Sequence, residues 1–220
     1  MKGDVKQRRR YDSPRRREQA AATRRAILEA AERLFGQRGY VRTSVAEIAA
    51  EAGVALKTVY AVFGTKTEVL RGVWNLRMRG DEEEVPMTER EWYRELINEP
   101  DPRRRLALVA RNARIVRERT AVVTEIVRQA APADERIAAL WDRFQRELYE
   151  IGMGGIAETL ERDGVLATDA RVATDILWAL THPDLYQLLV RQRGWSPERY
   201  ESWLVEALRR ELLRRRRQIG

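Results

Sequence analysis

Three side chains with hydrogen-bonding groups lie close together between residues 55 and 63. Lys57, Thr58 and Tyr60 carry an ammonium group and two hydroxyl groups on what the apolar spacing predicts to be a short helix. Such groups donate hydrogen bonds to phosphate oxygens and to the base edges of the DNA major groove. The segment is therefore a candidate for a helix that reads a nucleic acid.

Residues 43–63 have the packing pattern of a helix-turn-helix that would position these side chains. Ala49 is small where the second helix must approach the first, and Gly53 permits the left-handed backbone of a tight turn. Val59 is apolar where the second helix faces the core. Ser44 and Glu47 have the spacing of a capping box, which predicts that the first helix begins beside them.

The charge distribution favours a nucleic-acid partner. The formal net charge is +8; residues 1–80 contain 18 Lys and Arg against 8 Asp and Glu, whereas residues 81–220 contain 24 against 26. We expect residues 1–17 to form a basic, disordered arm, which could serve only as a solvated tail. Alternatively, its arginines could enter the minor groove of DNA. These arginines are Arg8, Arg9, Arg10, Arg15, Arg16 and Arg17.

The composition excludes several kinds of chemistry. The chain of 220 residues has no cysteine and a single histidine, His182, so thiol catalysis and multi-histidine metal sites are impossible. No nucleophile is paired with a base and no cofactor loop lies in a suitable context, so we expect no enzyme, no cofactor and no metal. No apolar run is long enough to span a bilayer. We expect a cytoplasmic protein that avoids membranes and associates with the nucleoid through DNA.

The apolar periodicity predicts an all-α chain of about nine to ten helices. After the arm, we expect a helix-turn-helix domain over residues 18–80 and a helical domain over residues 81–220. In the second domain the expected helices cover 88–97, 102–118, 120–130, 134–163, 169–181 and 197–215. Glycines between residues 152 and 155 interrupt the fourth of these and follow no strand, so they indicate a kink or a packing site.

Residues 43–70, TSVAEIAAEAGVALKTVYAVFGTKTEVL, resemble the N-terminal DNA-binding domain of TetR/AcrR-family transcriptional regulators. Two places depart from the family pattern, which often has Ser where this chain has Ala55 and polar or aromatic residues where it has Ala61-Val62. The matching positions are Thr43, Ile48, Ala49, Ala52, Gly53, Val54, Thr58, Tyr60, Phe63, Lys66 and Leu70.

The resemblance implies a three-helix DNA-binding domain followed by a helical domain for ligand binding and dimerisation. The implied function is a sequence-specific regulator, in most members a repressor, that a small-molecule effector releases from a palindromic operator. A non-specific, architectural DNA-binding protein is the alternative that the basic arm would suit.

The resemblance also assigns roles to individual residues on double-stranded DNA. Hydroxyl groups would contact phosphates, Lys57 would enter the major groove, and Lys66 would bind a phosphate beside its helix N-terminus. Tyr60 could instead be a core aromatic residue, and Lys57 a plain phosphate contact. The expected DNA-contacting residues are Arg42, Thr43, Ala55, Leu56, Lys57, Thr58, Tyr60 and Lys66.

Two further sets of residues are expected in the helical domain, and both could instead belong to the core of a single chain. Six tryptophans favour a hydrophobic effector. The aromatic and methionine candidates for its pocket are Trp74, Trp92, Tyr93, Trp141, Phe144, Tyr149, Met153, Trp178 and Tyr186. The apolar stripes expected to form a homodimer interface are Ile176, Leu177, Leu180, Trp203, Leu204, Ala207 and Leu208.

Overall fold

The computed structural model describes residues 14–80 and 85–214, and throughout these ranges the regular structure is helical. The chain separates into two compact units, one ending at Val73 and the other beginning at Trp74. The division lies within a single helix, somewhat before the expected boundary between residues 80 and 81. The all-α prediction is confirmed.

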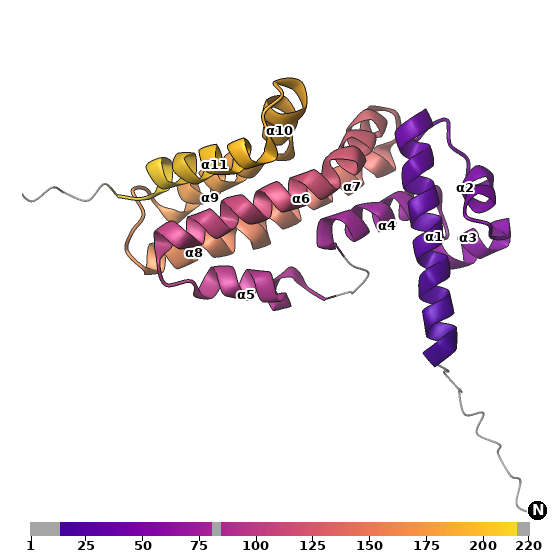
Figure 1. Ribbon diagram of the computed structural model, residues 1–220, viewed down its shortest axis with the longest axis horizontal. Helices are drawn as coiled ribbons and strands as arrows, with labels where there is room; N and C mark the ends of the chain where they lie inside the picture. Colours follow the sequence, from indigo (N-terminus) through magenta and orange to yellow (C-terminus); the bar gives the residue numbers. More distant parts are fainter. Residues whose placement is uncertain (1–13, 81–84, 215–220) are drawn as a thin grey trace, which may run out of the picture. The chain divides into compact units, whose positions relative to one another are not determined.

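From residue 14 onward, the first unit contains three helices and the beginning of a fourth (Figure 1). Helix α1 packs on α2, and α2 packs on α3. Their apolar sides meet in a core whose largest fully buried side chains include Phe35, Ile48 and Leu70. The bounds are α1 Pro14–Arg38, α2 Val45–Glu51, α3 Leu56–Phe63 and α4 Lys66–Arg79.

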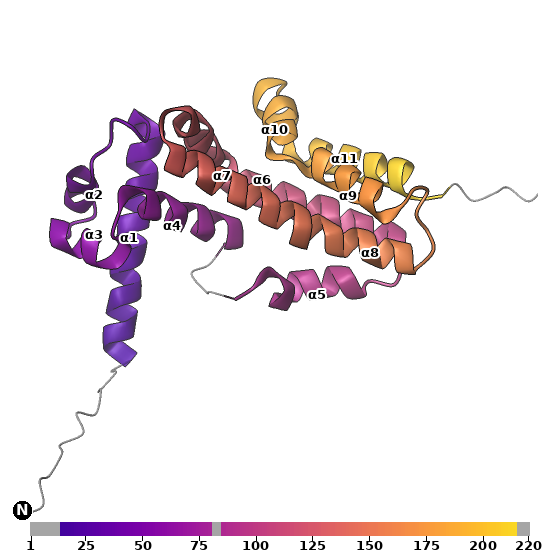
Figure 2. The same ribbon diagram turned by 180° about the vertical axis from the view of Figure 1, so that it is seen from behind.

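In the second unit α6 runs beside α11, and α8 runs beside α9 (Figure 1, Figure 2). Tyr200, Leu204 and Leu208 of α11 are fully buried in the core that these helices share. The bounds are α5 Glu91–Asn98, α6 Pro102–Ala130, α7 Glu135–Glu147, α8 Gly154–Arg162, α9 Ala170–Thr181, α10 Pro183–Tyr186 and α11 Pro197–Leu212.

Helix α6 is continuous where the sequence predicted two helices meeting near residue 119. The predicted break was wrong: residues 118–120 continue α6, and the Thr120 hydroxyl group donates to the Val116 carbonyl of the preceding turn at 2.8 Å.

The predicted helix over residues 134–163 is interrupted by a π-helical segment, Leu148–Met153, between α7 and α8. Gly155 follows this segment, and a Cβ atom built on it would lie 2.5 Å from the Tyr93 hydroxyl oxygen. The glycine therefore leaves room for the Tyr93 side chain of α5, which would have to shift if a Cβ were present. This agrees with the expected kink and packing site.

The stripes expected to form a dimer interface lie largely inside the single chain. Leu177, Leu204, Ala207 and Leu208 are at most 3% exposed, so their burial serves the core of one subunit. From the same stripes, Ile176, Leu180 and Trp203 are partly buried against this core and keep some exposed surface.

Candidate nucleic-acid interface and helical-domain cavity

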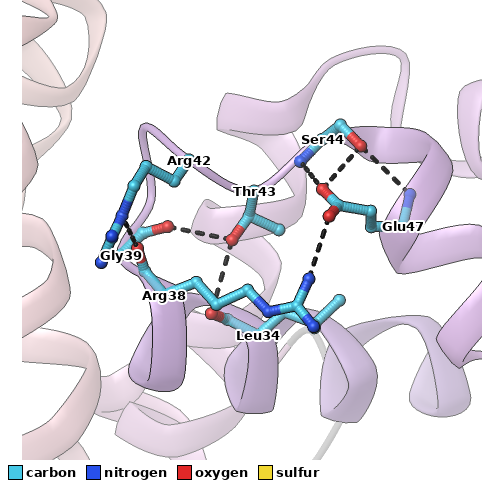
Figure 3. Close-up of polar contacts among 7 residues, drawn as sticks. All are labelled: Leu34, Arg38, Gly39, Arg42, Thr43, Ser44 and Glu47. Carbon is cyan, nitrogen blue, oxygen red and sulfur yellow. Dashed lines mark hydrogen bonds and ion pairs between the residues drawn. The ribbon is translucent and has the colours of Figure 1, made fainter.

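A capping box fixes the beginning of α2, as the sequence predicted (Figure 3). The Ser44 backbone N–H donates to Glu47 Oε2 at 2.8 Å, and the Glu47 N–H donates to Ser44 Oγ at 3.2 Å. The bond from the Ser44 backbone is the largest cause that lowers the pKa of Glu47, and Arg38 also contributes. The first helix of the helix-turn-helix thus has a defined start.

The turn between α2 and α3 depends on Gly53. Its φ angle is +67°, a left-handed conformation that costs other residues a steric penalty. The Val54 N–H donates to the Ala49 carbonyl at 3.0 Å across the turn. Helix α3 then begins after Ala55, whose side chain offers no cap.

Helix α3 has one buried face and one exposed face. Val59 and Phe63 are buried, whereas Tyr60 is 51% and Leu56 is 44% exposed. Tyr60 is therefore a surface residue, and the alternative of a core aromatic does not hold. Lys57 is also exposed, and Thr58 is half-buried. An ammonium and two hydroxyl groups are thus available on this helix for contacts to phosphates or bases.

The exposed side of α3 extends further than the sequence-based set of residues. Val62 is 37% exposed, and Ala61 is also exposed. Apolar side chains at such positions can contact the thymine methyl group in the major groove. Their departure from the family pattern was the available signal, although it did not show that they face solvent.

Thr43 does not have the phosphate-contacting role predicted for it. It is 1% exposed, and its hydroxyl group donates to the Gly39 carbonyl at 2.9 Å and the Leu34 carbonyl at 3.4 Å (Figure 3). These carbonyls lie at the C-terminal end of α1, where helical acceptors lack partners. Thr43 therefore holds the loop after α1 in place. Arg42 is exposed, and its Nε donates to the Arg38 carbonyl at 2.7 Å.

Lys66 is likewise occupied within the protein. Its Nζ donates to the Tyr40 carbonyl at 3.0 Å and to the Thr43 carbonyl at 2.9 Å. The ammonium group also lies 4.3 Å from the centroid of the Tyr40 ring. These contacts make Lys66 a brace that ties the α1–α2 loop to the beginning of α4, and the phosphate contact expected for it stays a prediction.

The basic arm lies partly inside the described residues. Helix α1 begins at Pro14, so Arg15, Arg16 and Arg17 are exposed residues of its first turns rather than of a disordered arm. Arg8, Arg9 and Arg10 lie outside the described residues. The prediction of minor-groove insertion therefore stays a prediction.

A cavity of about 390 Å³ lies in the second unit. Trp74, Trp92, Phe144 and Met153 line it, together with Tyr93, as the sequence analysis expected. The Trp74 and Phe144 rings stack with their centroids 4.5 Å apart. The volume and the apolar lining are those of a small-molecule site.

Four other expected lining residues lie elsewhere. Trp141 meets the edge of Trp74 with ring centroids 5.8 Å apart, and Trp178 packs against Tyr149. Tyr186 is buried against a second tyrosine of the core. None of these four lines the cavity: Trp141 packs behind the lining residue Trp74, and the other three meet aromatic neighbours outside the cavity.

Arg117 is a cavity residue that the sequence analysis missed. It is 3% exposed and its Nε donates to the Thr181 carbonyl at 2.9 Å. A signal was present, because Arg117 lies between Ala113, Val116 and Thr120, all buried, on α6. An arginine in such a stripe must be buried with them.

Other kinds of site are not found in the part of the chain that the structure describes. Within residues 14–80 and 85–214, no group of histidine and acidic residues could hold a metal ion. In these same ranges, each helix is too short or too polar to cross a bilayer.

Comparisons with known proteins agree with the helix-turn-helix. The family model "Bacterial regulatory proteins, tetR family" matches residues 27–73. The chain is 28% identical to the HTH-type transcriptional repressor BepR of Brucella suis over 206 residues, 89% of this chain and 96% of BepR. It is 44% identical to the HTH-type transcriptional regulator TtgR of Pseudomonas putida over 59 residues, 27% of this chain and 28% of TtgR.

Solved structures extend the similarity to both units. NalD, the secondary repressor of the MexAB-OprM multidrug efflux pump in Pseudomonas aeruginosa, superposes with a TM-score of 0.69 at 25% identity, over 90% of this chain and 98% of NalD. The SmeT–triclosan complex, at 22% identity, shares the fold with a TM-score of 0.68 over 88% of this chain and 92% of SmeT. The match of residues 27–73 to the tetR family model and the all-α fold shared with these regulators together indicate a DNA-binding transcriptional regulator of the tetR type.

Proposed function

We propose that the chain is a homodimeric repressor that binds an inverted-repeat operator in the cytoplasm and leaves it when a small molecule enters the cavity. The observation that carries the proposal is the exposed face of α3, the second helix of the packed helix-turn-helix. This face presents Lys57 and Tyr60 to solvent. Lys57 enters the major groove, and Tyr60 and Thr58 bind phosphates. Arg42 is exposed in the loop between α1 and α2 and contacts the DNA backbone.

We infer a dimer because the surface that one such helix offers to DNA is small. A single recognition helix covers one half-site, and a two-fold dimer reads two half-sites with the same side chains. The remaining exposed surface of Ile176, Leu180 and Trp203 is where we place the contact between subunits.

Helix α4 supports the response to a ligand. It begins at Lys66, which braces the α1–α2 loop, and further along it supplies Trp74, Asn75 and Met78 to the lining of the cavity. A ligand that contacts these side chains therefore contacts the same helix whose first residue is the brace. Among the relatives, BepR is a repressor, NalD represses a multidrug efflux pump, and SmeT was solved with triclosan.

Selection of duplexes from a random library at near-physiological salt tests the DNA-binding part. We expect an enriched inverted repeat, bound by a dimer in light scattering. Lys57→Ala should weaken binding to it roughly tenfold or more, as loss of a base contact does. The control Arg162→Ala, at an exposed position of the second unit, should bind like the wild type. A lack of enrichment, with equal binding to all duplexes that disappears as salt rises, would refute a specific repressor.

A further inference from the structure

Arg117 carries a buried charge that the described part of the protein does not neutralise. The structure shows a single hydrogen bond from its guanidinium, from Nε to a backbone carbonyl. Its Nη1 atom is buried and has no partner. Within residues 14–80 and 85–214, no carboxylate forms an ion pair with this arginine. A buried cation in this condition is unfavourable, because its lost hydration is not replaced.

Arg105, on the same helix, shows how this fold normally treats a buried arginine. It is 4% exposed, and its Nη1 donates to Asp163 Oδ2 at 2.7 Å. Its Nε and Nη2 donate to the Glu99 carbonyl at 3.0 and 2.6 Å. Arg105 is thus fully paired at the same depth, whereas Arg117 is not. The difference indicates that the stability of the fold does not by itself require an arginine at position 117.

The groups around Arg117 leave its charge in place. Burial lowers the pKa of Arg117 to about 10, so the guanidinium remains protonated at neutral pH. Burial raises the pKa of Tyr200 to about 12, so this nearby phenol is neutral and supplies no counter-charge. The pKa of His182 is lowered, mainly by burial and in part by Arg117, which favours the neutral imidazole, so this group supplies no counter-charge either.

Arg117 is also part of the wall of the cavity. Among the charged residues of this wall, arginines outnumber acidic residues. The charged lining residues are three arginines, Arg90, Arg117 and Arg119, and one glutamate, Glu147. Glu147 is exposed, and among the described residues it forms no ion pair with Arg117. The remaining wall is mostly apolar, with the stacked rings of Trp74 and Phe144.

From this combination we propose that the effector is an organic anion, with an acidic group that pairs with the guanidinium of Arg117 and an apolar body that packs on Trp74 and Phe144. The assignment rests on the proposed function, because it names the class of molecule that fills the regulatory cavity. A carboxylate is the simplest such group, since a guanidinium binds both of its oxygens with two parallel hydrogen bonds.

The test compares probes that share an apolar body and carry an anionic, a neutral or a cationic head group. We would measure calorimetric binding to the full-length dimer of 2-naphthylacetate, its primary amide and 2-(2-naphthyl)ethylamine, and of decanoate, decanamide and decylamine. At least one carboxylate should bind, roughly tenfold to hundredfold more tightly than its amide, as loss of a charge-assisted hydrogen bond implies. The amine should bind more weakly still. A tighter or equal amide or amine, or no binding by either carboxylate, overturns the proposal.

Variants of the arginine provide the second readout. Arg117→Met should lower carboxylate affinity by a similar factor and remove the carboxylate-induced rise in melting temperature. Without ligand it should melt close to the wild type, because removal of a charge with no ion-pair partner offsets the lost hydrogen bond to the Thr181 carbonyl. Arg117→Lys, which keeps the charge, serves if the methionine variant does not fold, and should lose only the bidentate part of the affinity. Unchanged carboxylate binding in either variant would overturn the assignment.

A control and a separate DNA assay distinguish the two proposals. Arg162→Met, an exposed arginine outside the cavity, should bind the carboxylates like the wild type. Failure of the chain to select any duplex sinks the repressor proposal but leaves direct anion binding measurable. Release of the selected duplex by the amine and not by the carboxylate sinks the anionic-effector assignment and leaves the repressor proposal standing.

Discussion

Replacing Lys66 by methionine should destabilise the DNA-binding unit without removing a phosphate contact. The substitution deletes two hydrogen bonds from the ammonium group, to the carbonyls of Tyr40 and Thr43, and a contact with the Tyr40 ring. Hydrogen bonds to charged groups contribute about 1.5–3 kcal/mol when buried. Because Lys66 is only half-buried, we expect a total loss of about 2 kcal/mol, near the lower end of that range.

Urea denaturation and the salt dependence of DNA binding together test this reasoning. Lys66→Met should lower the free energy of unfolding of the first unit by about 2 kcal/mol. It should leave the slope of log K against log salt unchanged. The matched variant Lys57→Met changes an exposed lysine, so it should keep the stability and weaken DNA binding. If Lys66→Met has wild-type stability and a slope smaller by about one, Lys66 is a phosphate contact and the brace is wrong.

Three further changes test the backbone, the helix kink and the histidine. Gly53→Ala puts a side chain at φ +67°, so the free energy of unfolding from urea titration should fall by about 1–2 kcal/mol. The comparison variant Ala50→Gly, at an exposed α2 position, should lower the free energy of unfolding by only about 1 kcal/mol. In Gly155→Ala the new Cβ would lie 2.5 Å from the Tyr93 hydroxyl oxygen, so melting temperature should fall and recover in part in the Gly155→Ala, Tyr93→Phe double variant; no recovery would place the clash elsewhere. Burial lowers the pKa of His182 from 6.5, so the unfolded state binds more protons as pH falls below that value, and the free energy of unfolding should decrease there. His182→Gln should flatten that decrease in urea titrations above pH 5, and an unchanged slope would assign it to other groups.

Local pattern was sufficient for the helix-turn-helix. Gly53 and the Ser44–Glu47 capping box act through neighbours within a few residues, so their types and spacing determine the geometry. The roles of Thr43 and Lys66 could not be predicted in this way. The Lys66 ammonium group reaches carbonyls 23 and 26 positions away, and the loop that presents them exists only after α1 and α4 have packed.

The cavity shows the same limit over longer distances. Aromatic residues at helical spacing could be identified as candidates. However, Trp74 lines the cavity and Trp178 does not, although both are tryptophans at similar positions in an apolar helical pattern. Their separation depends on which neighbour each ring meets: Trp74 stacks on Phe144, whereas Trp178 meets Tyr149 outside the cavity.

The two buried arginines of α6 show why ligand chemistry is the last property to emerge. In sequence, Arg105 and Arg117 are equivalent charged interruptions of an apolar stripe. Arg105 meets a carboxylate 58 positions away, and its charge then belongs to the structure of the protein. Arg117 meets a carbonyl 64 positions away and no carboxylate among the described residues, and the anionic effector proposed above would supply its counter-charge. In the functions proposed above, specificity for DNA lies in residues that the local motif exposes. Specificity for an effector then lies in a charge that the described part of the fold buries without neutralising, and long-range pairing decides which charge that is.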